Sequence, residues 1–144
     1  MLYFDTSFLA PLILEEANST KVEAFLATLP VGELYISHWA RIEFASLIAR
    51  EVRMGGFAEA DGLLAIGQFD ELVSESFRIV SPSVTDYELA KEYTQHFATG
   101  LQAGDALHLA IAHNNGAKIL YTLDDGLLHA AKLMKAHASR GIKT

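Results

Sequence analysis

The sequence predicts a single-domain α/β fold built around a parallel sheet of about five short strands. One observation supports the α/β class, and two support the single domain. Short apolar runs alternate with longer segments in which apolar residues recur every three or four positions, as is typical of α/β proteins. The chain has no internal repeat and no linker-like stretch rich in Pro, Gly or Ser. A chain of 144 residues is long enough to form one continuous core, so we expect a single domain over residues 1–144.

The first half of the chain alternates strand and helix twice. Residues 2–4 and 34–36 are short apolar runs bounded by polar residues, and they are expected to form strands. Residues 19–29, between them, repeat apolar side chains at helical spacing. Residues 38–54 have the same period and stop at Gly55-Gly56, a strong signal for the end of a helix.

The second half begins with a predicted helical hairpin and then returns to alternation. Residues 57–76 form its second arm, although Gly62 and Gly67 lower the helix propensity there by about 1 kcal/mol each relative to Ala. Further strands are expected at residues 78–80, 118–121 and 141–143, and further helices at residues 83–97, 104–115 and 125–137. Gly116 supplies the expected stop after the helix at 104–115.

Composition excludes several classes of function. With 0 Cys the chain has no disulfide, no thiolate metal site and no thiol chemistry, so any metal must be held by oxygen or imidazole. The opening residues lack a basic segment followed by an apolar run, and no stretch of 18 or more residues is free of charge. We therefore expect a cytoplasmic protein that does not enter a membrane.

The chain is acidic. Its formal charge is −7 at pH 7, with 18 Asp and Glu against 11 Lys and Arg. This balance argues against nonspecific binding to nucleic acid or to an anionic membrane. A polyanionic substrate would need bound cations, a local basic patch or a partner chain.

Acidic residues follow the predicted strands repeatedly, at the sheet edge where open parallel sheets bind ligands. Asp5 comes directly after the first strand, and Asp124 and Asp125 follow the strand at 118–121. Asp105 opens the helix that begins at residue 104. Each Asp taken alone is explained by helix capping, but several at one edge would repel one another unless a cation lay between them.

Glu43 is the most informative acid because its helical neighbours at i−4 and i+4 are Trp39 and Leu47, which places it beside an apolar stripe. A carboxylate buried there needs a partner such as Arg41, Arg50 or a backbone N–H, or a metal ion. Carboxylates without Cys suit Mg²⁺ or Mn²⁺. Such ions activate water and stabilise charge on a phosphodiester, so the cluster points to phosphate chemistry.

Four segments resemble the PIN-domain nucleases, in particular the small VapC-type toxins of bacterial toxin–antitoxin pairs. The first is the strand and turn at residues 3–7 (YFDTS), and the second is the helical segment at residues 42–47 (IEFASL). The third and most specific is residues 101–110 (LQAGDALHLA), and the fourth is residues 121–127 (YTLDDGL). The four occur in the family's order and span the whole chain.

The resemblance implies a role for each matched residue. The family's metal-binding, catalytic acids fall on Asp5, Glu43, Asp105 and Asp124, where Asp124 is chosen over its neighbour because it lies two residues past a threonine. Asp5, Asp105 and Asp124 would bind the metal directly, and Glu43 directly or through water. The hydroxyls expected to orient a carboxylate or a water molecule are those of Ser7 and Thr122, with turn and cap hydrogen bonding as the alternative.

The resemblance also implies a three-layer α/β/α fold, a homodimer and cleavage of RNA with Mg²⁺ or Mn²⁺ as cofactor. The products would carry 5′-phosphate and 3′-hydroxyl ends, and a VapB-type antitoxin would inhibit the enzyme. Because RNA is polyanionic, we expect Arg41 and Arg50, which share a helix with Glu43, to contact phosphates. For Arg53 on the same helix, a surface role is favoured.

Two alternatives remain open. The chain could be a PIN-like module that binds a partner without catalysis. It could also be an Mg²⁺-dependent phosphatase-like or receiver-like α/β protein, but Asp5-Thr6-Ser7 lacks the Asp-x-Asp of such phosphatases, and Ser81-Pro82 stands where a receiver would have its acceptor Asp. His108, three residues after Asp105, is expected to hydrogen-bond locally rather than to bind metal. An apolar stripe in the helix at 57–76 is either core or interface, since this hairpin often contributes to dimer or antitoxin contacts in the family.

Overall fold

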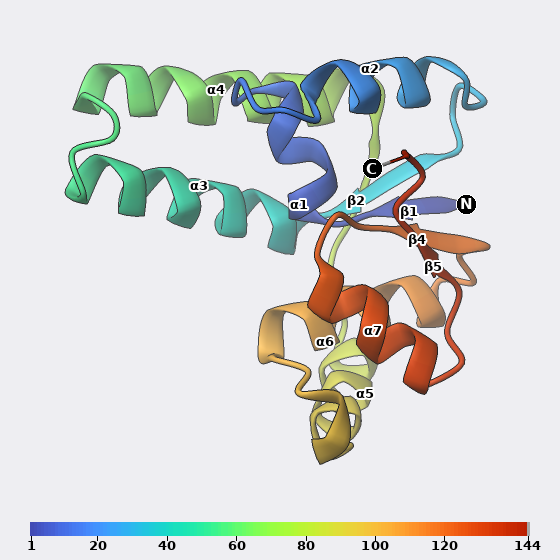
Figure 1. The fold of residues 1–144 in the computed structure, drawn as a ribbon. Helices are drawn as coiled ribbons and strands as arrows, with labels where there is room; N and C mark the ends of the chain where they lie inside the picture. The colour runs from blue at the N-terminus through green and yellow to red at the C-terminus, as the bar shows by residue number, and fades with distance from the viewer. Residues whose placement is uncertain (144) are drawn as a thin grey trace.

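The computed structural model describes residues 1–143, and its centre is a five-stranded parallel sheet in the order β3-β2-β1-β4-β5. The strands are β1 Leu2–Phe4, β2 Leu34–Ser37, β3 Arg78–Val80, β4 Ile119–Tyr121 and β5 Ala138–Ser139. Helices cover both faces: α2, α3 and α4 lie on one side of the sheet, and α5, α6 and α7 lie on the other (Figure 1). The predicted three-layer α/β/α fold is confirmed.

The helical segments connect the strands in chain order. They are α1 Thr6–Leu9, η1 Ala10–Leu12, α2 Ser19–Ala27, α3 His38–Arg53, α4 Glu59–Ser76, α5 Val84–Thr94, η2 Phe97–Thr99, α6 Ala103–Asn114 and α7 Asp125–Leu133. Helix α3 and helix α4 form the expected hairpin, which extends past the end of the sheet (Figure 1). No helix within residues 1–143 combines the length and apolar character needed to cross a bilayer.

Strand β1 lies at the middle of the sheet, and its side chains supply both cores. Tyr3 and Phe4 are each 0% exposed and, as neighbours in a strand, point to opposite faces. Phe4 packs in the core beneath α1 to α4, whereas Tyr3 packs in the core beneath α5 to α7. The carboxyl end of β1, with β2 and β4 paired on either side, is therefore the centre of the sheet edge where Asp5 begins the next turn.

The last strand was predicted in the wrong place. It pairs Leu120 with Ala138 and lies at residues 138–139, not at 141–143. Gly141 has φ of +67°, a left-handed conformation incompatible with an extended strand, and a Cβ there would lie 2.9 Å from the Phe25 ring. The chain turns at this glycine, so Ile142 packs against the core of the opposite layer instead of extending the sheet.

Several helix ends also differ from prediction. The helix at 125–137 stops at Leu133, because Lys135 takes a left-handed φ of 58° before the chain enters β5. The helix at 83–97 begins with the capping box of Ser83 and Asp86 but ends at Thr94. The short helices α1 and η1 were not predicted, since four residues are too few to show a helical period.

The apolar stripe of α4 is mostly core. Phe69 and Val73 are 0% exposed, and Phe57, Ile66 and Leu72 pack against the same core from its edge. A Cβ at Gly62 would lie 2.8 Å from Val52 on α3, so this glycine allows the two arms of the hairpin to pack closely. The remaining two leucines of the stripe, Leu63 and Leu64, are 66% and 60% exposed.

Candidate active site

Asp5 is the most buried of the predicted site acids, at 2% exposed. It caps α1 by accepting the Phe8 N–H at 3.0 Å, and it also accepts the Ser7 hydroxyl at 2.8 Å. Its second oxygen accepts the hydroxyl of Thr122, which follows β4. Burial raises the pKa of Asp5, while the nearby His108 and these hydrogen bonds oppose the rise. The carboxylate is thus held rigidly at the sheet edge.

The hydroxyls of Ser7 and Thr122 also tie two turns of the chain together. Ser7 Oγ accepts the Leu123 N–H at 3.0 Å, and Thr122 Oγ1 accepts the Asp124 N–H at 3.0 Å. The two oxygens lie 3.1 Å apart. The turn after β1 is therefore fixed against the turn after β4, although they are more than 100 residues apart in sequence.

Glu43 reaches the site from α3, and its partners differ from those expected. Its Oε1 accepts the Thr6 hydroxyl at 2.6 Å and is also bonded by His108 Nε2. The imidazole is 1% exposed, and its other nitrogen is hydrogen-bonded to the Tyr3 hydroxyl at 2.7 Å. Neither Arg41 nor Arg50 pairs with this carboxylate. A buried chain of hydrogen bonds, Tyr3–His108–Glu43, therefore positions it.

The pKa values of this pair shift in opposite directions. Burial alone would raise the pKa of Glu43, but the hydrogen bond and charge of His108, with help from Thr6 and Trp39, lower it overall. Burial alone would lower the pKa of His108, but Glu43 raises it, with smaller contributions from Asp5 and Asp105. The Trp39 indole N–H is buried and makes no hydrogen bond of normal geometry, yet it favours the charged form of the Glu43 carboxylate. The charged pair is thus favoured.

Asp105 lies in the first turn of α6 and is only partly buried. Burial and the carboxylates of Asp124 and Asp5, with a smaller contribution from Glu43, raise the pKa of Asp105 to about 6, although His108 opposes them. Within residues 1–143 its carboxylate accepts no hydrogen bond from a side chain or loop amide. Asp105 is thus the acid whose pKa is raised most by the other carboxylates of the site.

The adjacent acids Asp124 and Asp125 have separate surroundings. Asp124 caps α7 by accepting the Leu127 N–H at 3.0 Å, and it is the carboxylate that raises the pKa of Asp105 most. The Asp125 side chain is 89% exposed and pairs with Arg140 at 2.8 Å. Asp124 therefore belongs to the acidic cluster, which we define as Asp5, Glu43, Asp105 and Asp124, and its neighbour does not.

The acidic cluster has a donor set suited to a hard divalent cation, because it offers four carboxylates and no sulfur. A cation is favoured because Asp124 and Asp5, after burial, contribute to the raised pKa of Asp105, and a positive charge would offset both effects. In the described part of the chain, no three His, Asp or Glu side chains are arranged as a metal-binding group. The oxygens of Asp5 and Glu43 instead accept hydrogen bonds from protein donors.

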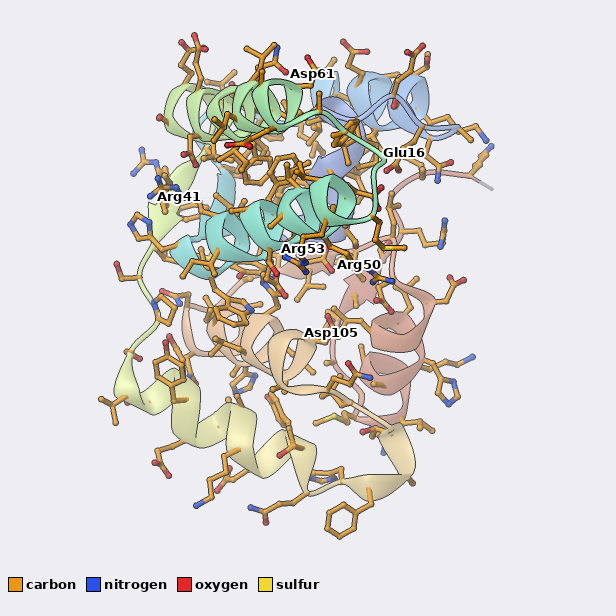
Figure 2. The ribbon with its side chains drawn as sticks, turned by 90° about the vertical axis from the view of Figure 1, so that its left-hand side faces the viewer. Glu16, Arg41, Arg50, Arg53, Asp61 and Asp105 are labelled. Carbon is orange, nitrogen blue, oxygen red and sulfur yellow. The ribbon has the colours of Figure 1, made fainter. Side chains whose placement is uncertain are left out.

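The two arginines predicted to contact substrate lie differently on α3. Arg41 Nε pairs with Asp70 of α4 at 2.9 Å. Arg50 comes seven residues after Glu43 and so shares its helix face. Figure 2 shows Arg50 and Arg53 on the side of α3 that faces the layer containing Asp105, with Arg41 near the other end of the helix.

Sequence reasoning missed three residues that shape the site. Thr6 holds Glu43, and Tyr3 holds His108. A tyrosine in a central, fully buried strand needs a partner for its hydroxyl, and that requirement could have flagged Tyr3. Gly104 is the third, since a Cβ there would lie 2.8 Å from Glu43 Oε2, too close for any larger residue without displacing the carboxylate.

Comparisons with known proteins agree with this architecture. The model of the family described as PIN domain matches residues 2–133. A search of curated protein sequences gives no significant match. VapC20 of Mycobacterium tuberculosis, described as a sarcin-ricin loop cleaving toxin, is similar in structure with a TM-score of 0.72 and 22% identity, over 90% of this chain and 95% of that one.

Two further solved structures are similar to this chain over nearly its whole length. FitAcB from Neisseria gonorrhoeae has a TM-score of 0.75 and 18% identity, over 98% of each chain. VapBC2 from Rickettsia felis, bound to a DNA fragment from its promoter, has a TM-score of 0.67 and 13% identity, over 96% of this chain and 98% of that one. At these identities the structural likeness establishes the fold.

Proposed function

The chain belongs to the PIN domain family, and from that premise we propose that it is a metal-dependent endoribonuclease and the toxin of a toxin–antitoxin pair. It would hydrolyse RNA phosphodiester bonds to 5′-phosphate and 3′-hydroxyl ends. The observation that carries the proposal is the acidic cluster, in which burial and then the neighbouring carboxylates of Asp124 and Asp5 raise the pKa of Asp105 to about 6. Four acids from separate elements are costly to hold together unless they bind a cation.

The proposed cofactor is Mg²⁺ or Mn²⁺, held by Asp5, Asp105 and Asp124, with Glu43 bound directly or through water. When bound, the ion lowers the pKa of coordinated water and offsets charge on the scissile phosphate. The protein's own part is to fix the ligands. Ser7 and Thr122 hold Asp5, as outer hydroxyls do in other metal sites.

The chain of hydrogen bonds from Tyr3 through His108 keeps Glu43 charged and fixes its position within the acidic cluster. A ligand carboxylate must be ionised to bind a metal, and His108 keeps Glu43 ionised by offsetting the burial that would otherwise raise its pKa. His108 is therefore assigned a positioning role beside the metal, not a ligand role.

Substrate contact is proposed for the arginines of α3. Arg50, on the face of the helix that carries Glu43, would bind phosphates flanking the scissile bond. Arg41 would do so only by leaving Asp70, so Arg50 is assigned the larger share. Local positive charge of this kind is required because the whole chain carries −7.

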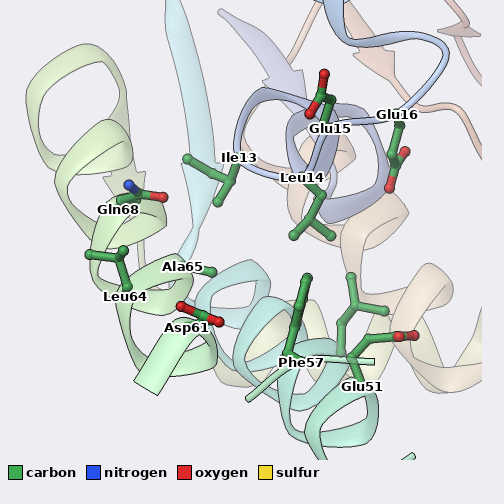
Figure 3. A pocket seen from close by; sticks show the side chains of 11 residues that line it. Ile13, Leu14, Glu15, Glu16, Glu51, Phe57, Asp61, Leu64, Ala65 and Gln68 are labelled. Carbon is green, nitrogen blue, oxygen red and sulfur yellow. The ribbon is translucent and has the colours of Figure 1, made fainter. Parts of the chain in front are cut away.

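The proposed protein partner is a VapB-type antitoxin. A groove of about 540 Å³ lies between the segment after η1 and the α3–α4 hairpin (Figure 3). Apolar side chains form its floor, and the acids around it are Glu15, Glu16, Glu51 and Asp61. An amphipathic antitoxin segment with basic residues fits this chemistry. The proposed toxin is also a homodimer located in the cytoplasm.

The principal alternative is a PIN module that binds a partner without catalysis. It is favoured by the finding that Asp5 and Glu43 direct their oxygens to protein donors. Membership in the PIN family disfavours the phosphatase-like and receiver-like alternatives.

Calorimetry with Mn²⁺ and an RNA cleavage assay separate the two functions. The enzyme predicts Mn²⁺ binding and RNA cleavage by the wild type, with both lost in Asp105→Asn. Asp125→Asn is the matched control, because this neighbouring acid lies outside the cluster and pairs with Arg140. Absence of Mn²⁺ binding to the wild type would favour the partner-binding module. Cleavage that survives Asp105→Asn would instead contradict the assignment of Asp105 to the site.

A further inference from the structure

A second cavity adjoins the acidic cluster on the side of α5 and α6. Its volume is about 290 Å³, at the lower end of the range for ligand sites, which suits one planar group. The residues that line it are Trp39, Tyr87, Ala90, Lys91, Thr94, Ala103 and Leu107. We refer to it as the Trp39 pocket.

Three helices build the Trp39 pocket. Helix α5 contributes Tyr87, Lys91 and Thr94 at spacings of four and three residues, so that they share one helix face. Tyr87 is 54% exposed, although it lies beside an aromatic ring and apolar side chains. The pocket therefore presents a partly open aromatic surface.

The Trp39 pocket and the acidic cluster share a wall. Trp39 lies one helical turn before Glu43 on α3, and Ala103 lies two residues before Asp105 on α6. A Cβ at Gly104 would lie 3.6 Å from the Trp39 indole nitrogen and 2.8 Å from Glu43 Oε2. The indole thus faces the cluster with its N–H, while the residue also lines the pocket.

The charge of the Trp39 pocket differs from that of the groove beside η1. Lys91 is its only charged lining residue, whereas four acids line the groove beside η1. In the part of the chain that the structure describes, the Lys91 ammonium forms no ion pair or hydrogen bond. A lysine beside two aromatic rings matches a phosphate and its base, the repeating unit of single-stranded nucleic acid.

We propose that the Trp39 pocket binds one unstacked nucleobase of single-stranded RNA next to the scissile phosphate. The inference rests on the proposed function and adds a substrate subsite to it. The base stacks on Tyr87 and Trp39, and Lys91 contacts the adjoining phosphate. The subsite gives an acidic protein a hold on RNA that does not depend on its overall charge, and it selects unpaired over duplex RNA.

Trp39 is the single tryptophan of the chain, so its fluorescence reports directly on the pocket. The test titrates the Asp105→Asn variant, which would not cleave, with single-stranded RNA hexamers and with a hexamer that lacks every base. The base-containing hexamers are expected to quench the emission saturably, and the abasic hexamer is not. Equal quenching by the abasic hexamer would overturn the proposal.

Substitutions on α5 locate the subsite. Tyr87→Ala is expected to weaken binding about tenfold, because stacking on one aromatic side chain contributes a factor of about 5 to 150. Tyr87→Phe keeps the ring and should restore binding. Lys91→Ala should reduce the slope of log affinity against log salt by about 1. Phe97→Ala and Lys132→Ala, on exposed residues outside the pocket, are the matched controls.

Activity and assembly complete the test. In the cleaving enzyme, Tyr87→Ala should raise KM and leave kcat nearly unchanged. Quenching without cleavage by the wild type would refute the proposed function and retain the subsite. Cleavage with affinity unaffected by Tyr87→Ala would refute the subsite and retain the enzyme. If that variant instead dissociates a dimer in sedimentation while RNA affinity is unchanged, the pocket is an interface between copies and the proposal fails.

Discussion

Removing one charge from the acidic cluster should make the metal-free protein more stable. Burial, followed by the carboxylates of Asp124 and Asp5, raises the pKa of Asp105 from 3.8 to about 6, a difference of about two pH units. Each unit corresponds to about 1.4 kcal/mol, so the ionised carboxylate would destabilise the fold by about 3 kcal/mol without screening. Because Asp105 is only partly buried, water reduces this penalty. We therefore expect Asp105→Asn to raise the free energy of unfolding by about 1–2 kcal/mol at pH 7.5.

The sign of the pH dependence follows from the raised pKa. Below pH 3.8 Asp105 is protonated in both the folded and unfolded states, so it contributes no penalty. Between 3.8 and about 6 the unfolded state loses its proton first, and stability falls as the pH rises. Above about 6 the full penalty is present. Asp105→Asn should therefore exceed the wild type in stability at pH 7.5 and lose that advantage near pH 4.

Urea unfolding of chelator-treated protein at several pH values measures this difference, with equal m-values required for the comparison. Asp125→Asn, at an exposed acid outside the cluster, should show no such gain. Saturating Mn²⁺ should reverse the order, since a ligand at 100 times its Kd stabilises the wild type by about 2.7 kcal/mol. A pH-independent gap between Asp105→Asn and wild type would show that the carboxylates do not interact, and the proposed metal site would fail with it.

Three further predictions concern other parts of the molecule. Tyr3→Phe should lower the free energy of unfolding by about 1–2 kcal/mol and weaken Mn²⁺ binding about tenfold in calorimetry, because His108 loses a buried partner. Unchanged Mn²⁺ affinity would contradict the positioning role of His108. Arg50→Ala should lower the salt dependence of RNA binding by about one phosphate contact, more than Arg41→Ala does, and an unaltered slope would remove Arg50 from the substrate path. Phe69→Ala should destabilise by about 3–5 kcal/mol in urea unfolding, since the ring is 0% exposed, and a loss below 1 kcal/mol would place it outside the core.

The parts of the fold that sequence predicted are those with a local signal. The end of the helix at Gly55-Gly56 and the start of the helix predicted at residue 83 follow from a few neighbouring residues, and both lie within two residues of the expected place. The last strand failed because its location depends on Gly141 packing against Phe25, more than 100 residues away. The four-residue helix after Asp5 was missed because it is shorter than two helical turns.

The site shows the same division between local and distant information. Its candidate acids stand out in the sequence because several of them follow strands at one sheet edge, although each alone would be an ordinary helix cap, and because Glu43 lies beside an apolar stripe. The partners of Glu43 could not, since His108 lies 65 residues away and nothing in the sequence relates them. The sequence shows that Glu43 needs a partner. Which residue provides that partner depends on which helix packs across the sheet edge.

The central position of β1 determines how late in synthesis the acidic cluster can assemble. The first strand leaves the ribosome early and can pair with β2, but its other neighbour is β4, near the end of the chain. Asp124 and Thr122, which complete the surroundings of Asp105 and Asp5, follow β4 directly. Under the proposed function, a nascent chain would therefore stay inert until the residues after β4 have emerged, and the toxin would not attack RNA while it is still being translated.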